Sequence, residues 1–213
     1  MWTPLSQSFF KPSAEIIAPA LLGHWLIRNT PNGPCGGPIV ETEAYLTSDP
    51  ASHAYAGETS RNRVMWGSPG RAYVYLIYGC HFCVNAVCRP TGTAEAVLIR
   101  AVEPALGEEL MRRNRSVKHI HELSNGPAKV CQAMAIDRDL DGVSLCDADS
   151  PLFIGSNPEV NRFRETRWPI VRATRIGITK ATDSPLRFYL EGSPFVSRRG
   201  TGNRLDRWSE WRA

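Results

Sequence analysis

Apolar residues fall into short runs that alternate with polar side chains along much of the chain. The segments 38–46, 71–78, 81–88 and 95–102 are rich in β-branched and aromatic residues, and turn-forming residues separate them. Strands are predicted for all four. The same character predicts strands later in the chain at 151–154, 170–178 and 186–191.

Apolar residues spaced three and four positions apart predict helices. One is expected over 14–26, and the turn-forming cluster PNGPCGGP at 31–38 is expected to follow its end. Two more are expected over 105–116 and 125–136. Strands and helices are thus mixed along the chain.

Three observations bear on domain organisation. Residues 47–70 form a long polar loop, and loops of that length inside a domain are often functional. The polar segment 198–213 is expected to be partly ordered at best. No interdomain linker or internal repeat interrupts the pattern, so residues 1–213 are predicted to form one α+β domain.

The stretch IVETEAY (39–45) carries two carboxylates within a predicted strand. Glu41, Glu43 and Tyr45 alternate and therefore share a face. The opposite face carries Val40, Thr42 and Ala44. That face is predicted to lie in the core, and the acidic face is predicted to line a functional site.

Composition is that of an ordinary globular protein. Hydrophobic residues make up 42% of the 213 residues and charged residues 22%. No run of about 18 apolar residues predicts a membrane helix. The N-terminal segment lacks the basic start and long apolar run of a signal peptide, so we expect an intracellular protein.

The net charge of +4 and the pI of about 8.8 point weakly to nucleic acid. Of the 25 basic residues, 21 are arginine and four are lysine. Arginine binds phosphate through a planar fork and stacks on bases, so this bias fits a nucleic-acid partner. A GC-rich genome would explain the bias equally well, and composition does not separate the two.

Cys80, Cys83 and Cys88 lie close enough in sequence to suggest a metal site. However, no second CxxC pair or spaced histidine pair completes a zinc ligand set. We therefore expect reduced structural thiols, with no metal and no organic cofactor.

The segment RAYVYLIYGCHFCVN (71–85) is unusually aromatic. Tyr73 and Tyr75 share one strand face, and Tyr78 precedes Gly79, where the chain is expected to turn. Packing within a half-buried sheet is the usual role of such tyrosines. Alternatively, the rings form a stacking platform for a flat, preferably cationic base, and Tyr78 inserts into a duplex.

A carboxylate beside such a platform could act as a general base on water. Two neighbouring acids also suggest a sugar hydrolase, but in that chemistry the two carboxylates lie on opposite sides of the scissile bond. Glu41 and Glu43 point the same way on one strand face. We therefore predict one catalytic and one structural glutamate.

Several blocks of sequence together resemble one known family. They are VETEAY (40–45), RNR (61–63), YVYLIYG (73–79), VLIRAVEP (97–104), NGPAKVCQAMAI (125–136), RIGI (175–178) and PLRFYLEGSPFVS (185–197). In this order and spacing, the chain resembles a bacterial-type member of the alkyladenine (3-methyladenine) DNA glycosylase family. The resemblance implies a curved, antiparallel-rich sheet flanked by helices, with a protruding hairpin that carries Tyr78.

The resemblance also implies catalytic roles. It makes Glu43 the general base that activates water, and Arg100 and the backbone carbonyl of Ile176 the groups that help to hold this water. The pocket implied for the flipped base comprises Tyr45, His53, Tyr75 and Asn85. Of these, Asn85 would exclude guanine by clashing with its 2-amino group.

Contacts with the DNA itself follow from the same resemblance. Tyr78 is the implied wedge that fills the gap in the duplex. Cys80 lies beside it, where the family's human enzyme has a methionine. The implied contacts with the DNA backbone are Thr59, Arg61 and Lys129.

The predicted function is a monofunctional glycosylase of base excision repair. It would flip alkylated or deaminated purines (3-methyladenine, 7-methylguanine, hypoxanthine and ethenoadenine) from duplex DNA and hydrolyse their glycosidic bonds. We expect an intracellular, DNA-associated monomer, with no lysine near enough to form a Schiff base.

Two alternatives remain open on the sequence. A non-catalytic damaged-DNA or RNA binding protein on the same fold would not need Glu43 together with Arg100. A hydrolase of small nucleosides or sugars would not need the arginine bias or a wedge at Tyr78.

Overall fold

The computed structural model describes residues 2–200 and 202–205 of the chain. The strands in this part are β1 (Trp25–Thr30), β2 (Gly33–Tyr45), β3 (Ala72–Ile77), β4 (His81–Cys88), β5 (Glu95–Val102), β6 (Leu152–Gly155), β7 (Ile170–Ala173), β8 (Arg187–Leu190) and β9 (Gly202–Leu205). The α-helices are α1 (Ala14–Ala20), α2 (Glu108–Asn114), α3 (Pro127–Ala133) and α4 (Val160–Thr166). Short 3-10 helices lie at Gln7–Phe10, Arg63–Trp66, Ile120–Glu122 and Arg138–Leu140.

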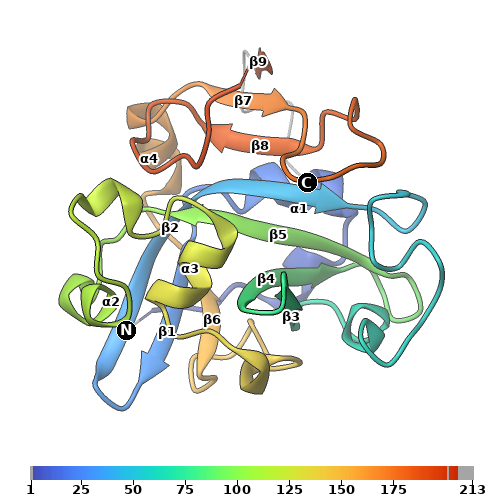
Figure 1. Ribbon diagram of the computed structural model, residues 1–213, viewed down its shortest axis with the longest axis horizontal. Helices are drawn as coiled ribbons and strands as arrows, with labels where there is room; N and C mark the ends of the chain where they lie inside the picture. The colour runs from blue at the N-terminus through green and yellow to red at the C-terminus, as the bar shows by residue number, and fades with distance from the viewer. Residues whose placement is uncertain (1, 201, 206–213) are drawn as a thin grey trace.

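The strands of the described residues join into one antiparallel sheet (Figure 1). Its main path runs β3-β4-β5-β2-β8-β7-β9. Strand β1 pairs with the first part of β2 and, on its other side, with β6. The predicted α+β class and antiparallel sheet are confirmed.

Helices cover both faces of the centre of this sheet. In Figure 1, α3 lies in front of β4 and β5, and α1 lies behind β2. Every residue of β5 is buried. Its sequence does not alternate between polar and apolar residues, as expected for a strand that is covered on both faces. The central strands accordingly have no solvent-facing side.

Both faces of the stretch 39–44 are buried. Val40, Thr42 and Ala44 lie in the core as predicted, and the Thr42 hydroxyl donates to the Ala18 carbonyl. Glu41 and Glu43 are also completely buried, at 0% exposure. The acidic face is thus a second interior surface, and its charges must be neutralised within the protein.

The helix predicted over 14–26 is wrong beyond Ala20. Gly23 has a φ of +85°, which no helix continues, and the residues after it form β1. Of the turn predicted over 31–38, only residues 31–32 form one, and the prediction is wrong for residues 33–38, which begin β2. There the glycines permit close approach of backbones: a Cβ on Gly36 would lie 2.0 Å from the Leu26 carbonyl oxygen.

Three other differences lie in the second half. The strand predicted over 170–178 ends at Ala173, and helix α4 was not predicted. Part of the polar segment 198–213 forms β9, an edge strand on β7. Residues 206–213 of that segment lie outside the described part of the chain.

His24 supplies a buried titratable group where α1 meets β1. Its Nδ1 accepts a hydrogen bond from the Asn157 backbone N–H at 3.2 Å. Burial, and then the nearby Arg164 guanidinium, lower the pKa of His24 from 6.5 to about 4. The native protein therefore holds this imidazole neutral.

We expect acid to destabilise the protein through His24. Because its pKa is lower in the folded state than in the unfolded state, the unfolded state binds more protons as the pH falls below 6.5. The free energy of unfolding should fall by roughly 2–3 kcal/mol between pH 6.5 and 4 from this group alone. His24→Asn keeps an acceptor for Asn157 but cannot titrate. Urea unfolding at several pH values should give a flatter dependence for the variant; equal slopes would contradict the assignment.

Candidate active site

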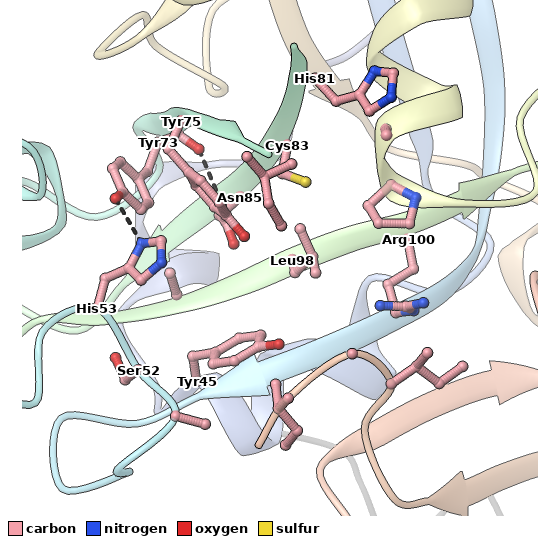
Figure 2. Close-up of a pocket in the computed structure, with 18 of the residues that line it drawn as sticks. Tyr45, Ser52, His53, Tyr73, Tyr75, His81, Cys83, Asn85, Leu98 and Arg100 are labelled. Atoms are coloured by element: carbon pink, nitrogen blue, oxygen red, sulfur yellow. Dashed lines mark hydrogen bonds between the residues drawn. The ribbon is translucent and has the colours of Figure 1, made fainter. Parts of the chain in front are cut away.

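A cavity of about 560 Å³ opens beside the β2–β5 pair. Figure 2 shows side chains from β2, β3, β4, β5 and the loop before β3 pointing into a common space. The remaining wall comes from the start of α3 and from residues 176–180. Cavities that hold small ligands usually measure about 300–1,000 Å³, so a flat base would fit.

Glu43 lies immediately behind the wall of this cavity. Its Oε2 accepts the Tyr45 hydroxyl at 2.9 Å, and its Oε1 accepts the Ile176 backbone N–H at 2.8 Å. Arg100 forms an ion pair with Oε2 at 3.1 Å. All three partners border the cavity, whereas Glu43 has no exposed surface of its own.

Arg100 owes its position to an irregularity in the β2–β5 ladder. Glu41 pairs with Ala101 and Thr42 pairs with Ile99, so Arg100 between them has no partner on β2. Such a bulge redirects the side chain of its extra residue. Burial alone would lower the pKa of Arg100, but Glu43 and Glu41 raise it above its ordinary value, so the side chain stays charged.

Glu41, which had no predicted role beyond a structural one, binds three side chains. Its Oε1 accepts Arg100 Nε at 3.0 Å, Arg187 Nε at 2.7 Å and the Ser197 hydroxyl at 2.8 Å. Its Oε2 accepts the Ser197 backbone N–H at 2.7 Å. Burial alone would raise the pKa of Glu41, but these partners lower it overall. Glu41 is thus a buried ionised group outside the cavity wall.

An aromatic wall formed by His53, Tyr73 and Tyr75 faces Tyr45 across the cavity (Figure 2). Tyr73 and Tyr75 stack with centroids 5.4 Å apart, and His53 meets Tyr75 edge-on at 4.5 Å. His53 Nδ1 lies 2.9 Å from the Tyr73 hydroxyl. Asn85, opposite Tyr73 in the β3–β4 ladder, donates to the Tyr73 carbonyl at 3.0 Å. The predicted pocket residues His53, Tyr75 and Asn85 therefore lie together.

The shifted pKa values keep this wall neutral. Burial raises the pKa of Tyr73 to about 12, and burial also raises the pKa of Tyr75. Partial burial, followed by the charge of Arg61, lowers the pKa of His53. The family resemblance gave Tyr73 no pocket role, although the shared strand face had suggested that Tyr73 and Tyr75 together form a stacking platform.

The Tyr45 ring packs against the ion pair of Arg175 and Asp49, which sequence reasoning missed. Arg175 binds both carboxylate oxygens of Asp49 and donates to the Ala44 carbonyl at 3.0 Å. Its guanidinium carbon lies 4.7 Å from the centre of the Tyr45 ring. The signal was the block RIGI, which contains Arg175 and Ile176 but suggested a role for Ile176 alone.

Tyr78 lies in the turn between β3 and β4 and borders the cavity mouth. Its side chain is 80% exposed, and its φ of +53° is unusual for a bulky residue. Cys80 is exposed two residues later. Cys83 and Cys88 are buried in β4, and no cysteine of the described residues is paired.

The predicted backbone-contact residues differ in their surroundings. Arg61 donates to the Leu76 carbonyl at 3.0 Å and lies over the Tyr75 ring. The Thr59 backbone N–H donates to the side-chain oxygen of Asn62. The side-chain nitrogen of Asn62 donates to two backbone carbonyls of the same loop. Lys129 bonds Asn125 at 2.7 Å on α3, whose first residues border the cavity.

Lys180 borders the cavity and is exposed. Sequence reasoning did not place Lys180 at this cavity, because residues 176–180 approach the cavity only through the fold.

Within the described residues, no helix is long and apolar enough to cross a membrane. The same residues contain no cluster of three or more His, Cys, Asp or Glu side chains arranged to hold a metal ion.

Comparison with known proteins agrees with this geometry. Residues 8–194 match the family described as "Methylpurine-DNA glycosylase (MPG)". A protein of Methanoculleus marisnigri named "Putative 3-methyladenine DNA glycosylase" is 47% identical over 92% of this chain and 99% of its own length. A Rhizobium meliloti protein of the same name is 47% identical over 90% and 95% of the two chains. The chain therefore belongs to the methylpurine-DNA glycosylase family, and with it to the DNA glycosylases, enzymes that hydrolyse N-glycosyl bonds.

Proposed function

We propose that the protein hydrolyses the N-glycosidic bond of alkylated or deaminated purines that it flips out of duplex DNA. Candidate substrates are 3-methyladenine, 7-methylguanine, hypoxanthine and ethenoadenine. The observation that carries the proposal is Glu43, a buried carboxylate held by three groups that border a base-sized cavity. We expect the enzyme to act as an intracellular monomer.

Glu43 is proposed as the general base. A carboxylate offers about four acceptor sites, and the contacts above use two on Oε2 and one on Oε1. The site left on Oε1 would take the attacking water, next to Ile176. The Ile176 carbonyl and Arg100 would help to hold this water. The negative charge would also stabilise the cationic character that the sugar develops as the bond breaks.

The aromatic wall is proposed to select the base. Tyr45 and Tyr75 would stack on it, and a neutral His53 would bond it without repelling a cation. Alkylated purines such as 3-methyladenine and 7-methylguanine carry positive charge, which ring faces attract. Asn85 would exclude guanine through its 2-amino group.

The hairpin turn is proposed to enter the duplex. Tyr78 would fill the space that the flipped nucleotide leaves, with Cys80 beside it. Thr59, Arg61 and Lys129 would contact the DNA backbone, and we add Lys180. The amine of Lys180 is exposed rather than enclosed in the apolar surroundings that make lysines nucleophilic, so hydrolysis should leave an uncut abasic site.

Glu43→Gln should abolish base release and preserve DNA binding. Glutamine has the same shape but cannot take a proton from water, and loss of a general base typically slows a reaction by about 10²–10⁴-fold. Single-turnover release of hypoxanthine from a duplex measures the rate, and fluorescence anisotropy with an abasic duplex measures binding. A variant that excises at near the wild-type rate would disprove the mechanism.

Tyr78→Ala should weaken capture of the lesion. Loss of a ring stacked in DNA typically costs about 1–3 kcal/mol, so affinity for an ethenoadenine duplex should fall by roughly 5- to 150-fold. Tyr55→Ala is the matched control, because Tyr55 is also exposed, at 54%, but does not border the cavity. Equal affinities for the two variants would exclude the wedge role.

Lys180→Ala should reduce the salt dependence of binding. Each neutralised phosphate adds about one to the slope of log affinity against log salt, so the slope should fall by about one. Lys11→Ala, which changes an exposed lysine away from the cavity, should leave the slope unchanged. Binding titrations at several salt concentrations measure both, and an unchanged slope for Lys180→Ala would rule out the phosphate contact.

A further inference from the structure

Glu41 is held by four donors in the described part of the chain. Arg100, Arg187 and the Ser197 hydroxyl reach its Oε1, and the Ser197 backbone N–H reaches its Oε2. Glu41 is also fully buried and does not border the cavity. It therefore cannot replace Glu43 as the general base.

Glu41 and Glu43 hold opposite ends of the same guanidinium. Arg100 Nε donates to Glu41, and a terminal nitrogen of Arg100 faces Glu43. Because the guanidinium is planar and rigid, fixing Nε fixes the direction of its terminal nitrogens. Glu41 is fixed in turn by the Ser197 backbone N–H and by Arg187, which stacks over Tyr189.

The same group is balanced in charge. Two carboxylates, Glu41 and Glu43, face two guanidinium groups, Arg100 and Arg187, so the formal charges cancel. Removing the charge of Glu41 would leave a net positive charge beside Glu43. A sugar that develops positive charge would then form in a less favourable field.

We propose that Glu41 is a positioning residue for base excision. It orients Arg100 towards Glu43 and the cavity, and it balances the positive charge behind them. This role rests on the proposed function, because it acts through Arg100 on the reaction assigned to Glu43.

Charge and position can be separated with two substitutions. Glu41→Gln keeps the shape and removes the charge, so excision should slow by roughly tenfold to a hundredfold. The acid limb of its pH–rate profile should move to lower pH, because removing a buried negative charge makes protonation of the site less favourable. Glu41→Asp keeps the charge but withdraws the carboxylate by one methylene, so the rate should fall while the acid limb stays in place.

Other charged and titratable groups surround Glu43 and must be considered in that profile. They are Arg100 on β5, Arg187 on β8, Tyr45 on β2, Tyr75 on β3, Cys83 on β4, and Arg175 with its partner Asp49. Burial raises the pKa values of Tyr45, Tyr75 and Cys83, so none of these three titrates on the acid limb. His53, whose pKa is lowered, also borders the cavity, but it and the other groups are the same in Glu41→Asp. A shift of that limb in Glu41→Gln alone therefore reports the charge of Glu41.

The experiment measures single-turnover excision of hypoxanthine across pH, affinity for an abasic duplex, and the melting temperature. Glu103→Gln is the matched control, because Glu103 also accepts bonds from an arginine, Arg167, and a serine, Ser193, but lies away from the cavity. We expect slower excision for both Glu41 variants, a shifted acid limb for Glu41→Gln alone, and unchanged abasic-duplex affinity. Glu103→Gln should match the wild type in all three.

The outcomes distinguish this role from the proposed function. A wild-type protein that releases no lesion base would overturn both. An active wild type with unaltered Glu41 variants would overturn the positioning role alone. The positioning role would also be overturned if activity fell only in proportion to the amount of folded protein and the acid limb of Glu41→Gln did not move. If Glu41→Gln does not fold, Glu41→Asp and Ser197→Ala take its place, and wild-type rates in both would refute the role.

Discussion

Two buried carboxylates on the central strand β2 impose the strongest constraint on this structure. An isolated ionised carboxylate in a protein interior is unfavourable by several kcal/mol unless a cation and hydrogen bonds accompany it. Glu41 and Glu43 lie at 0% exposure on β2, and Arg100 from β5 and Arg187 from β8 neutralise them. The two strands that flank β2 must therefore each bring an arginine to the same point.

This requirement explains why the ladder is irregular there. In a regular antiparallel ladder Arg100 would have a partner on β2, but the bulge leaves it without one. The side chain can then reach both acids. Buried ion pairs are seldom an efficient way to stabilise a fold, and apolar residues of similar volume often serve as well or better. The cluster is therefore better explained by the chemistry of the adjoining cavity than by stability.

Sequence patterns predicted the strands whose residue types alone indicate a strand. The strands β4 and β5 were predicted at their observed bounds, because apolar and β-branched residues fill them from end to end. The start of β2 was missed because its glycines and prolines are typical of turns. Their role there is to let the Gly36 backbone lie against Leu26, a requirement that only the paired strand reveals. The first helix was predicted to continue too far. The spacing of apolar residues carries no information about the positive φ at Gly23, which ends the helical path.

In the site, too, some residues could be predicted from the sequence pattern and others depend on how the strands pair. Alternation along β3 placed Tyr73 and Tyr75 together, and the resemblance named His53, which does meet them. Arg175 and Arg187 could not be found in this way, because their partners Asp49 and Glu41 are distant in sequence. Lys180 could not be found either, because only the fold brings it to the cavity. The two sides of the cavity also differ in construction. Glu43 and its partners are fixed by charge in the sheet interior, whereas Tyr78 is exposed on a turn with a left-handed backbone. The proposed general base is thus held in a buried, charge-paired environment, whereas the proposed wedge lies on an exposed turn.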